Sequence, residues 1–206
     1  EIRVEKAPKS KWIFVAGGGP GGMEFALTAA QRGHQVTLFE KESVLGGQVN
    51  LAQAPPRKGE LSRIIESMSG RMKRAGVRIR LKKKLTAAFV KKNAPDLVVV
   101  ASGAQPLKIK VPGLKRPHVV GAWDVLLDRV PHIGKNIVVV GGSATGCETA
   151  HYIAALNTPD NDTLAFLSYH NAEDPDYLAK LLHDSGRRIT IIEMADKIAA
   201  NAGRTS

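Results

Sequence analysis

The sequence has a single cysteine, Cys147, among its 206 residues. One cysteine cannot form a disulfide within the chain or a Cys-x-x-Cys redox pair, and alone it cannot hold an iron–sulfur cluster or a zinc ion. Cys147 lies at the start of an expected helix, one residue after a glycine, which favours a small core residue over a nucleophile. Redox chemistry in this chain therefore requires a bound organic cofactor.

Long apolar runs are also missing. No stretch approaches the roughly 20 apolar residues that span a membrane, and residues 1–6 do not resemble a signal peptide. We therefore expect a cytoplasmic protein with no membrane partner. The six histidines show no spacing typical of metal ligands, and no Ser/His/Asp set or carboxylate pair can be assigned, so neither a metal site nor a catalytic residue is predicted. The chain begins without Met and stops shortly after a strand-like run, which we interpret as a fragment.

Positive charge is confined to the first part of the chain. Residues 1–116 carry 23 basic and 8 acidic side chains, a net +15, whereas residues 117–206 carry a net −4. Residues 57–92 hold 13 of the basic side chains, but Phe89 is their only aromatic residue, so a nucleic-acid surface is not predicted. Apolar and basic residues alternate over 77–81, which indicates a half-buried strand with a solvated basic face. A docking surface for an acidic partner remains the functional alternative.

The first part of the chain is organised as a βαβ unit. An apolar strand is expected at residues 12–16, followed by a glycine-rich turn at 17–22, a helix at 23–32 and a second strand at 35–39. A crossover of this kind pairs the strands in parallel. Downstream, apolar residues at helical spacing predict a helix over 59–75, with Met68 and Met72 in the core, and a strand over 77–81. The continuous apolar run 97–101 predicts a strand buried on both faces.

A second cycle of the same pattern begins at residue 136. It consists of a strand at 136–140, a glycine-rich turn at 141–146, a helix at 147–156 and a strand at 189–192. Residues 157–185 form an insertion, with a helix expected over 176–184. The sequence therefore predicts an α/β protein with two Rossmann-like dinucleotide-binding βαβ units and parallel sheets, the second truncated. Prolines at 106, 112 and 117 place the boundary near residue 117, giving domains 1–117 and 118–206.

The first glycine-rich turn matches the dinucleotide fingerprint G-x-G-x-x-G. Its six residues are Gly17, Gly18, Gly19, Pro20, Gly21 and Gly22. Gly17 permits the tight turn, Gly19 leaves room for a phosphate and Gly22 allows close packing of helix and strand, while the helix N-terminus holds the pyrophosphate. Glu40 ends the next strand, where its carboxylate can accept hydrogen bonds from the ribose hydroxyls of an adenosine. A purely structural turn is the alternative.

The second turn departs from the fingerprint at one position. Gly141, Gly142 and Gly146 match, but Ser143 replaces the middle glycine. Its β-carbon would crowd a phosphate, whereas its hydroxyl could donate a hydrogen bond to one. Glu193 ends the following strand and suits an unphosphorylated ribose, which favours NADH over NADPH. Here a structural βαβ unit without a nucleotide remains the alternative.

Together these residues resemble the flavoproteins with two dinucleotide domains, in which FAD binds first and a nicotinamide nucleotide second. Residues 101–103, Ala-Ser-Gly, are similar to the Ala-Thr-Gly of that group at the crossing from the FAD domain. The segments 44–48, 121–126 and 146–150 resemble more narrowly the C-terminal part of the NADH:flavin oxidoreductases related to 2,4-dienoyl-CoA reductase, 2-enoate reductase and trimethylamine dehydrogenase. The resemblance covers nearly the whole chain.

The resemblance implies cofactors, site residues and a partner. It implies that FAD is contacted by Gly17, Gly19, Pro20, Gly21 and Gly22 of the first fingerprint and by Glu40, Lys41, Gly47, Gln48, Leu85, Ala101 and Gly103. It implies that NADH is contacted by Gly141, Gly142, Ser143, Gly146 and Glu193. Members of the family carry FMN, a 4Fe–4S cluster and the substrate site in an N-terminal (β/α)₈ barrel, which has no counterpart in this sequence and would be the partner domain.

Three hypotheses for function follow. In the first, the chain is an electron-input module in which NADH reduces FAD, and the electrons pass on to the barrel. In the second, it is a non-catalytic scaffold that binds ADP in place of FAD, as resemblance to trimethylamine dehydrogenase allows. In the third, the basic stretch 57–92 docks on an acidic face of the barrel or of another protein.

Overall fold

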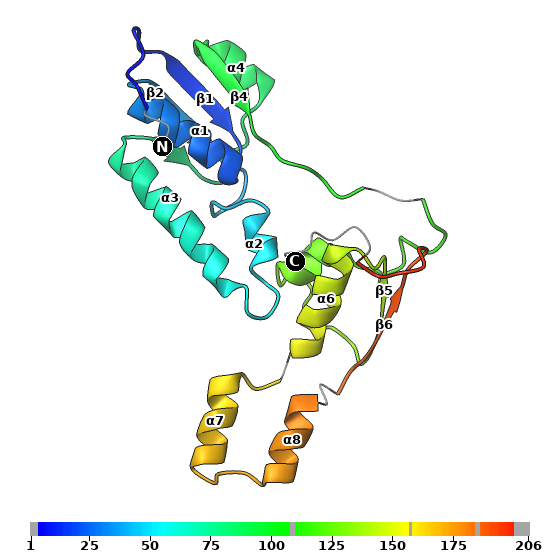
Figure 1. Ribbon diagram of the computed structural model, residues 1–206. Helices are drawn as coiled ribbons and strands as arrows, with labels where there is room; N and C mark the ends of the chain where they lie inside the picture. Colours follow the sequence, from blue (N-terminus) through cyan, green and yellow to red (C-terminus); the bar gives the residue numbers. More distant parts are fainter. Residues whose placement is uncertain (1–3, 108–109, 157, 184–185, 200–206) are drawn as a thin grey trace. The chain divides into compact units, whose positions relative to one another are not determined.

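The computed structural model describes residues 4–107, 110–156, 158–183 and 186–199 (Figure 1). Contacts along the chain divide it into two compact units. The first unit contains residues 1–53 and 57–111, and the second contains residues 54–56 and 112–206.

The first unit is built on a parallel four-stranded sheet. Its strands are β1 (Trp12–Ala16), β2 (Gln35–Phe39), β3 (Arg78–Arg80) and β4 (Leu97–Val100), in the order β3-β2-β1-β4. Ile13 pairs with Val36 on one side and with Leu97 on the other. The helices α1 (Pro20–Gln31) and α3 (Ser62–Arg74) pack against this sheet, and the buried core between them includes Ile13, Val15, Met23, Leu27, Leu38 and Met72.

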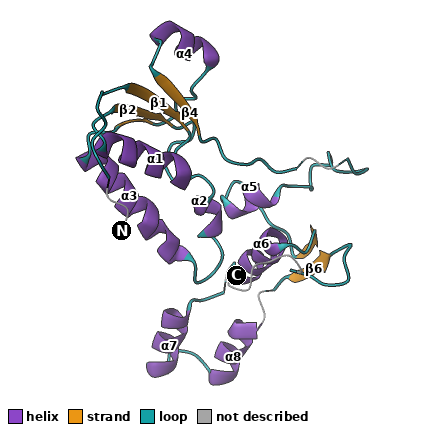
Figure 2. Cartoon of the chain, turned by 45° about the horizontal axis from the view of Figure 1, so that its top comes forward, coloured by secondary structure: helices purple, strands orange, loops and turns teal. Residues whose placement is uncertain are grey.

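The opposite face of the sheet carries an aromatic cluster. Phe14 and Phe39 lie 5.0 Å apart between ring centroids, and Phe89 from α4 (Ala87–Asn93) lies 5.5 Å from Phe39. Figure 2 shows α4 on the side of the sheet away from α1 and α3. Edge-to-face ring pairs of this kind add to the stabilisation from burial alone. The helix α4 and the short α2 (Val49–Ala52) were not expected from the sequence.

Several expected boundaries shift for identifiable reasons. The helix α1 begins at Pro20, three residues earlier than expected, because proline is favoured in the first turn of a helix. The expected helix at 59–75 starts as a 3₁₀ turn, η1 (Gly59–Leu61), before continuing as α3. The prediction that Met72 belongs to the core is confirmed, and Met68 packs against that core half-buried.

The expectation that the strand at 97–101 is buried on both faces is wrong. Leu97 is 41% exposed and Val100 is 76% exposed, because β4 lies at the edge of the described sheet and pairs with β1 alone. The apolar run identified a strand correctly, but it did not distinguish a central strand from an edge strand.

The second unit repeats the βαβ arrangement. The parallel strands β5 (Asn136–Val140) and β6 (Arg188–Ile192) are connected through α6 (Ala144–Ala155), whose buried residues include Ala150 and Ile153. The helix α5 (Ala122–Leu126) packs against α6 and buries Val125 and Leu126. The predicted α/β fold with two parallel βαβ units is confirmed.

The insertion between α6 and β6 is a helical hairpin. It contains α7 (Asn161–Tyr169), which the sequence did not indicate, and α8 (Pro175–His183). The expected helix at 176–184 is thus present, although Asp184 lies outside the described residues. Arg187 donates a hydrogen bond from Nη1 to the carbonyl oxygen of Leu156 at 2.6 Å, which ties together the two ends of the insertion. In the part of the chain that the structure describes, no helix is long and apolar enough to cross a bilayer.

Candidate functional site

The turn between β1 and α1 is tightly packed at two of its glycines. Gly17 has φ +116°, donates a hydrogen bond to the carbonyl oxygen of Phe39 at 2.9 Å, and lies so close to Ala101 that a β-carbon would overlap the carbonyl oxygen there. A β-carbon on Gly22 would overlap the carbonyl oxygen of Gly17. Gly17 and Gly22 therefore occupy positions where only glycine lets strand, turn and helix approach.

A β-carbon on Gly18 would also be crowded, by the side chain of Leu45 at 2.6 Å, whereas the remaining two glycines of the turn, Gly19 and Gly21, border open space. A β-carbon on Gly19 would meet only the Cα of Gly47, at 3.9 Å, and one on Gly21 would meet nothing within 4 Å. The first hydrogen bond of α1 is donated by Met23 to Gly19 at 2.9 Å, so the helix N-terminus with Pro20 at its start opens toward this space. Free amides and the positive end of a helix dipole at an open surface fit a phosphate group.

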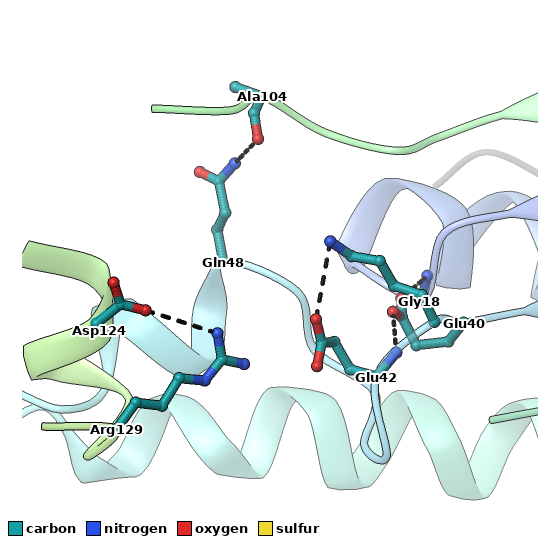
Figure 3. Close-up of polar contacts among 8 residues, drawn as sticks. Gly18, Glu40, Glu42, Gln48, Ala104, Asp124 and Arg129 are labelled. Atoms are coloured by element: carbon teal, nitrogen blue, oxygen red, sulfur yellow. Dashed lines mark hydrogen bonds and ion pairs between the residues drawn. The ribbon is translucent and has the colours of Figure 1, made fainter. Parts of the chain in front are cut away.

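Glu40 is fixed in place by the backbone around it. Its side chain is 6% exposed, with Oε2 accepting a hydrogen bond from the N–H of Gly18 at 2.7 Å and Oε1 accepting one from the N–H of Glu42 at 2.9 Å (Figure 3). Each carboxylate oxygen can accept a second hydrogen bond. Glu40 can therefore also accept hydrogen bonds from ribose hydroxyls. The neighbouring Lys41 is exposed and pairs with Glu42 at 3.7 Å.

A loop covers the fingerprint turn. Gly46 donates a hydrogen bond from its N–H to the carbonyl oxygen of Gly18 at 2.8 Å, and a β-carbon on Gly47 would lie 3.0 Å from the Cα of Gly19. Gln48 donates from Nε2 to the carbonyl oxygen of Ala104 at 3.2 Å (Figure 3), and a β-carbon on Gly103 would lie 3.5 Å from the same Nε2. The loop therefore brings two of the predicted site residues, Gly47 and Gln48, to the open side of the turn.

The remaining predicted residues of the first site lie at its borders. Lys83 donates a backbone hydrogen bond to the carbonyl oxygen of Glu40 at 2.8 Å, and the half-buried Leu85 follows two residues later. Ala101 continues β4 and packs against Gly17. The sequence did not indicate Gly18 and Gly46 as residues of the site, although Gly18 lies in the fingerprint and Gly46 lies in the segment 44–48.

The turn between β5 and α6 repeats this geometry. Gly141 donates to the carbonyl oxygen of Ile192 at 2.8 Å, Cys147 donates to that of Ser143 at 2.9 Å, and a β-carbon on Gly146 would overlap the carbonyl oxygen of Gly141. Cys147 is half-buried and its thiol contacts the carbonyl oxygen of Gly142 at 3.4 Å. Apart from the thiol contact, these contacts correspond one by one to those of the first turn.

Ser143 fits its position without backbone strain. Its φ and ψ are −68° and 176°, close to the −77° and 174° of Gly19 in the first turn. This is extended backbone that any residue adopts. The departure from the fingerprint therefore leaves the turn intact and places a hydroxyl where the first turn has open space.

Glu193 is held by three backbone donors. Oε2 accepts from the N–H of Gly142 at 2.6 Å, and Oε1 accepts from Met194 at 2.7 Å and from Ala195 at 2.9 Å. The hydrogen bond from Ala195, followed by those from Gly142 and Met194, lowers the pKa of Glu193 below its ordinary value. The side chain is therefore a carboxylate at neutral pH.

The second glycine turn is also covered by a backbone contact. The residue that makes this contact lies as far along the chain from its glutamate as the corresponding residue does in the first site. Ala199 donates a hydrogen bond to the carbonyl oxygen of Gly142 at 2.6 Å, as Gly46 does to Gly18. Each donor lies six residues after its glutamate, and each has a positive φ, 55° for Ala199 and 116° for Gly46. The sequence analysis missed this correspondence because glycine in one loop is replaced by alanine in the other.

The two sites differ in the structure that lies next to the glycine turn. A β-carbon on Gly17 would overlap Ala101 at the end of β4, whereas one on Gly141 would meet nothing within 4 Å. The described part of the second unit has two strands, and neither stands where β4 stands in the first unit. Within the described residues the second unit therefore has a smaller sheet than the first.

A groove of about 630 Å³ lies beside the first site. It runs between the loop at Val44 and Leu45, the α3 residue Ile65 and the β3 residue Ile79, and none of the fingerprint glycines lines it. Among the described residues, no group of three or more His, Cys, Asp or Glu side chains could hold a metal ion.

Comparison with known proteins places this geometry in a family. A family model described as pyridine nucleotide-disulphide oxidoreductase matches residues 11–205. A metal reductase of Desulforamulus reducens is 38% identical over 98% of the chain and 31% of the relative, and an NADH oxidase of Thermoanaerobacter brockii is 40% identical over 73% of the chain and 24% of the relative. The solved structure of a 2-naphthoyl-CoA reductase in complex with 2-naphthoyl-CoA covers 95% of the chain, which spans 31% of it, with a TM-score of 0.73 and 27% identity.

Proposed function

Because the chain belongs to the pyridine nucleotide-disulphide oxidoreductase family, we propose that it is the FAD- and NADH-binding part of a larger flavoprotein oxidoreductase. Its relatives include NADH oxidase, bilirubin reductase and cinnamate reductase, so the resemblance to the NADH:flavin oxidoreductases is confirmed. The chain spans 31% of one of the curated relatives that it matches and 24% of another. The activity of the whole protein is therefore part of the proposal.

The observation that carries the proposal is the duplicated contact between a glycine turn and a glutamate. Gly18 donates to Glu40 in the first unit, and Gly142 donates to Glu193 in the second, in both cases at a parallel β-strand followed by a 12-residue helix. A helix N-terminus beside a fixed carboxylate matches two adjacent parts of an ADP group, its pyrophosphate and its ribose. A purely structural turn requires neither the open space at Gly19 and Gly21 nor the buried carboxylate.

We assign FAD to the first unit. The amides of the fingerprint turn would hold its pyrophosphate, and Glu40 would accept hydrogen bonds from its ribose. The open surface at Gly19 and Gly21 supports this fit. The residues proposed to border the cofactor are Lys41, Gly47, Gln48, Leu85, Ala101 and Gly103.

We assign NADH to the second unit. Gly141, Gly142 and Gly146 would shape the turn, and the Ser143 hydroxyl would donate a hydrogen bond to the pyrophosphate. The low pKa of Glu193 keeps a negative charge at the ribose position, which repels the 2′-phosphate of NADPH. Arg187 does not offset this charge, because it donates to the carbonyl oxygen of Leu156 at the other end of β6.

The chemistry belongs to the cofactors, since a bound nicotinamide supplies a hydride and a bound flavin accepts it. The side chains of this chain bind and orient the two nucleotides, and none is assigned to a bond-breaking step. We further propose that the electrons pass to FMN and a 4Fe–4S cluster in an N-terminal (β/α)₈ barrel of the same protein. The greater length of the relatives leaves room for such a domain.

The identity of the bound nucleotide tests the proposal. The purified protein should show the visible absorption of a flavin, and denaturation should release FAD, identified by its mass. Release of ADP from a colourless protein would instead support a non-catalytic scaffold, and release of neither after incubation with both would argue against a nucleotide site in the first unit.

A further inference from the structure

The helix α7 has apolar side chains on two opposite sides. Leu164 is buried, as is Leu178 of α8, where the two helices lie side by side (Figures 1 and 2). Phe166 lies two residues after Leu164, about 200° around the helix, and it is 60% exposed. Tyr169, one turn further on, is 83% exposed. The second apolar side therefore has no partner within the described residues.

The exposed side of α7 is a compact aromatic surface. The rings of Phe166 and His170 lie 4.4 Å apart between centroids, and those of Tyr169 and His170 lie 5.1 Å apart. Positions 169 and 170 each lie one helical turn after position 166, so the three rings share one side. Exposed aromatic groups of this kind are the side chains that anchor protein–protein interfaces. We call Phe166, Tyr169 and His170 the aromatic surface.

The hairpin that presents this surface is locally stabilised. Asp160 caps α7 by accepting a hydrogen bond from Thr163 at 2.7 Å, and Asp174 accepts one from Asp176 at 2.8 Å at the start of α8. The bond from Arg187 to Leu156 closes the base of the insertion. The aromatic surface is thus held on fixed helices, which reduces the entropy lost when a partner binds.

The charge of the hairpin indicates a basic partner. Residues 158–183 contain five acidic side chains and one basic side chain, Lys180. Asp162 lies one turn before Phe166 and so on the same side of α7 as the aromatic surface. Guanidinium groups combine ion pairing with a carboxylate and stacking on an aromatic ring. An arginine-rich surface is therefore the best match.

The chain itself carries such a surface. Arg78 and Arg80 are exposed on β3, which lies at an edge of the described sheet, and the exposed Lys82 and Lys84 follow. We call these four residues the basic edge. Two arginines two residues apart on a strand are separated by about 6.6 Å. This matches the roughly 5–6 Å between Cβ atoms one turn apart on a helix, such as those of Phe166 and Tyr169.

We propose that the α7–α8 hairpin of one copy of this chain docks on the basic edge of a second copy. The aromatic surface stacks against Arg78 and Arg80, and Asp162 pairs with one of these guanidinium groups. The occupant is a second copy because both complementary surfaces belong to the same sequence, one in the acidic part and one in the basic part. The contact makes no use of the fingerprint turns.

Sedimentation of the purified chain tests the contact. At about 50 mM salt the chain should self-associate, and raising the salt to about 500 mM should weaken association at least about tenfold, since the charged groups are screened. The double variant Phe166→Ser/Tyr169→Ser should sediment as a monomer, with unchanged circular dichroism because both side chains are exposed. Leu107→Ser removes another exposed apolar side chain, which is 88% exposed, and should leave association unchanged.

A mixture of two variants, each of which lacks one of the two surfaces, provides the decisive experiment. Arg78→Glu/Arg80→Glu destroys the basic edge but keeps the hairpin, whereas Phe166→Ser/Tyr169→Ser keeps the basic edge. Each variant should be monomeric alone, and an equimolar mixture should regain association through one intact hairpin and one intact edge. A wild-type chain that stays monomeric at low salt, association unaffected by both double variants, or a mixture that remains monomeric would each overturn the proposal.

Discussion

The carboxylate of Glu40 and the backbone N–H of Gly18 are joined by a 2.7 Å hydrogen bond across 22 positions of the chain, and Glu193 and Gly142 are joined by one of 2.6 Å across 51 positions. In both units the group expected to bind ribose is thus attached to the turn expected to bind pyrophosphate. The spacing of these two groups is set by the fold itself. Such preorganisation reduces the cost of ordering the site around a nucleotide.

Glu40 should be essential for FAD binding, although it lies outside the fingerprint. In Glu40→Gln only one side-chain oxygen remains as an acceptor, so the hydrogen bonds from Gly18 and Glu42 can no longer both form. We expect FAD affinity to fall by about 10- to 100-fold, from the loss of charge-assisted hydrogen bonds worth roughly 1.5–3 kcal/mol. Titration calorimetry with FAD measures the change. Glu42→Gln, two residues away, should bind FAD with nearly unchanged affinity.

Gly22 and Gly21 should respond differently to the same substitution. A β-carbon on Gly22 would overlap the carbonyl oxygen of Gly17, whereas one on Gly21 would meet nothing within 4 Å. Gly22→Ala should therefore lower the free energy of unfolding of the first unit by about 1–3 kcal/mol, the usual effect of overpacking. Gly21→Ala should change it by less than about 0.5 kcal/mol. Urea denaturation compares the two, and equal effects would contradict the packing described here.

The sequence was sufficient to predict the βαβ units and the ends of three of their four strands, because these follow from apolar runs and glycine spacing. Strands 12–16, 35–39 and 136–140 agree with the structure residue for residue. The exposure of Val100 could not be predicted, since it depends on the position of β4 at the edge of the described sheet rather than on the apolar run itself. The helix α7 was missed because its exposed aromatic residues blur the helical period that identifies a buried face.

The parts of the site that are formed by glycine and glutamate residues could be predicted from the sequence. The parts that are formed by contacts between backbone atoms could not. The contact from Ala199 to Gly142 involves only main-chain atoms, so neither residue type signals it. The equal offset of Gly46 and Ala199 from their glutamates is the signal that could have found it. The assignment of each predicted residue to FAD or NADH remains a prediction.

The low pKa of Glu193 predicts how stability depends on pH. Because the folded-state pKa lies below the unfolded value, the stabilisation from Glu193 is fully present above the unfolded pKa and is lost as the pH falls through the folded pKa. The difference in unfolding free energy between the wild type and Glu193→Gln should be constant above about pH 5 and should shrink below about pH 4. A difference that instead grew on acidification would show that the three backbone bonds do not stabilise the charged form.

Ser143→Gly should weaken NADH binding without affecting the fold. The backbone of Ser143 is extended like that of Gly19, so glycine is accommodated there without rearrangement. Loss of one hydrogen bond from the hydroxyl to the pyrophosphate should reduce NADH affinity by about 2- to 12-fold, equivalent to about 0.5–1.5 kcal/mol. Fluorescence titration with NADH measures this. Tighter binding in Ser143→Gly would show that the β-carbon crowds the phosphate, as the fingerprint rule suggests.

If the two units bind two different nucleotides, reducing equivalents should pass from NADH in the second unit to FAD in the first. An anaerobic titration of the FAD-loaded protein with NADH, monitored by the visible absorbance of the flavin, measures this transfer. We predict that NADH bleaches this absorbance at close to one equivalent, that NADPH does so far less efficiently, and that Glu193→Arg abolishes the response to NADH. A flavin that stays oxidised while NADH is bound would contradict the account.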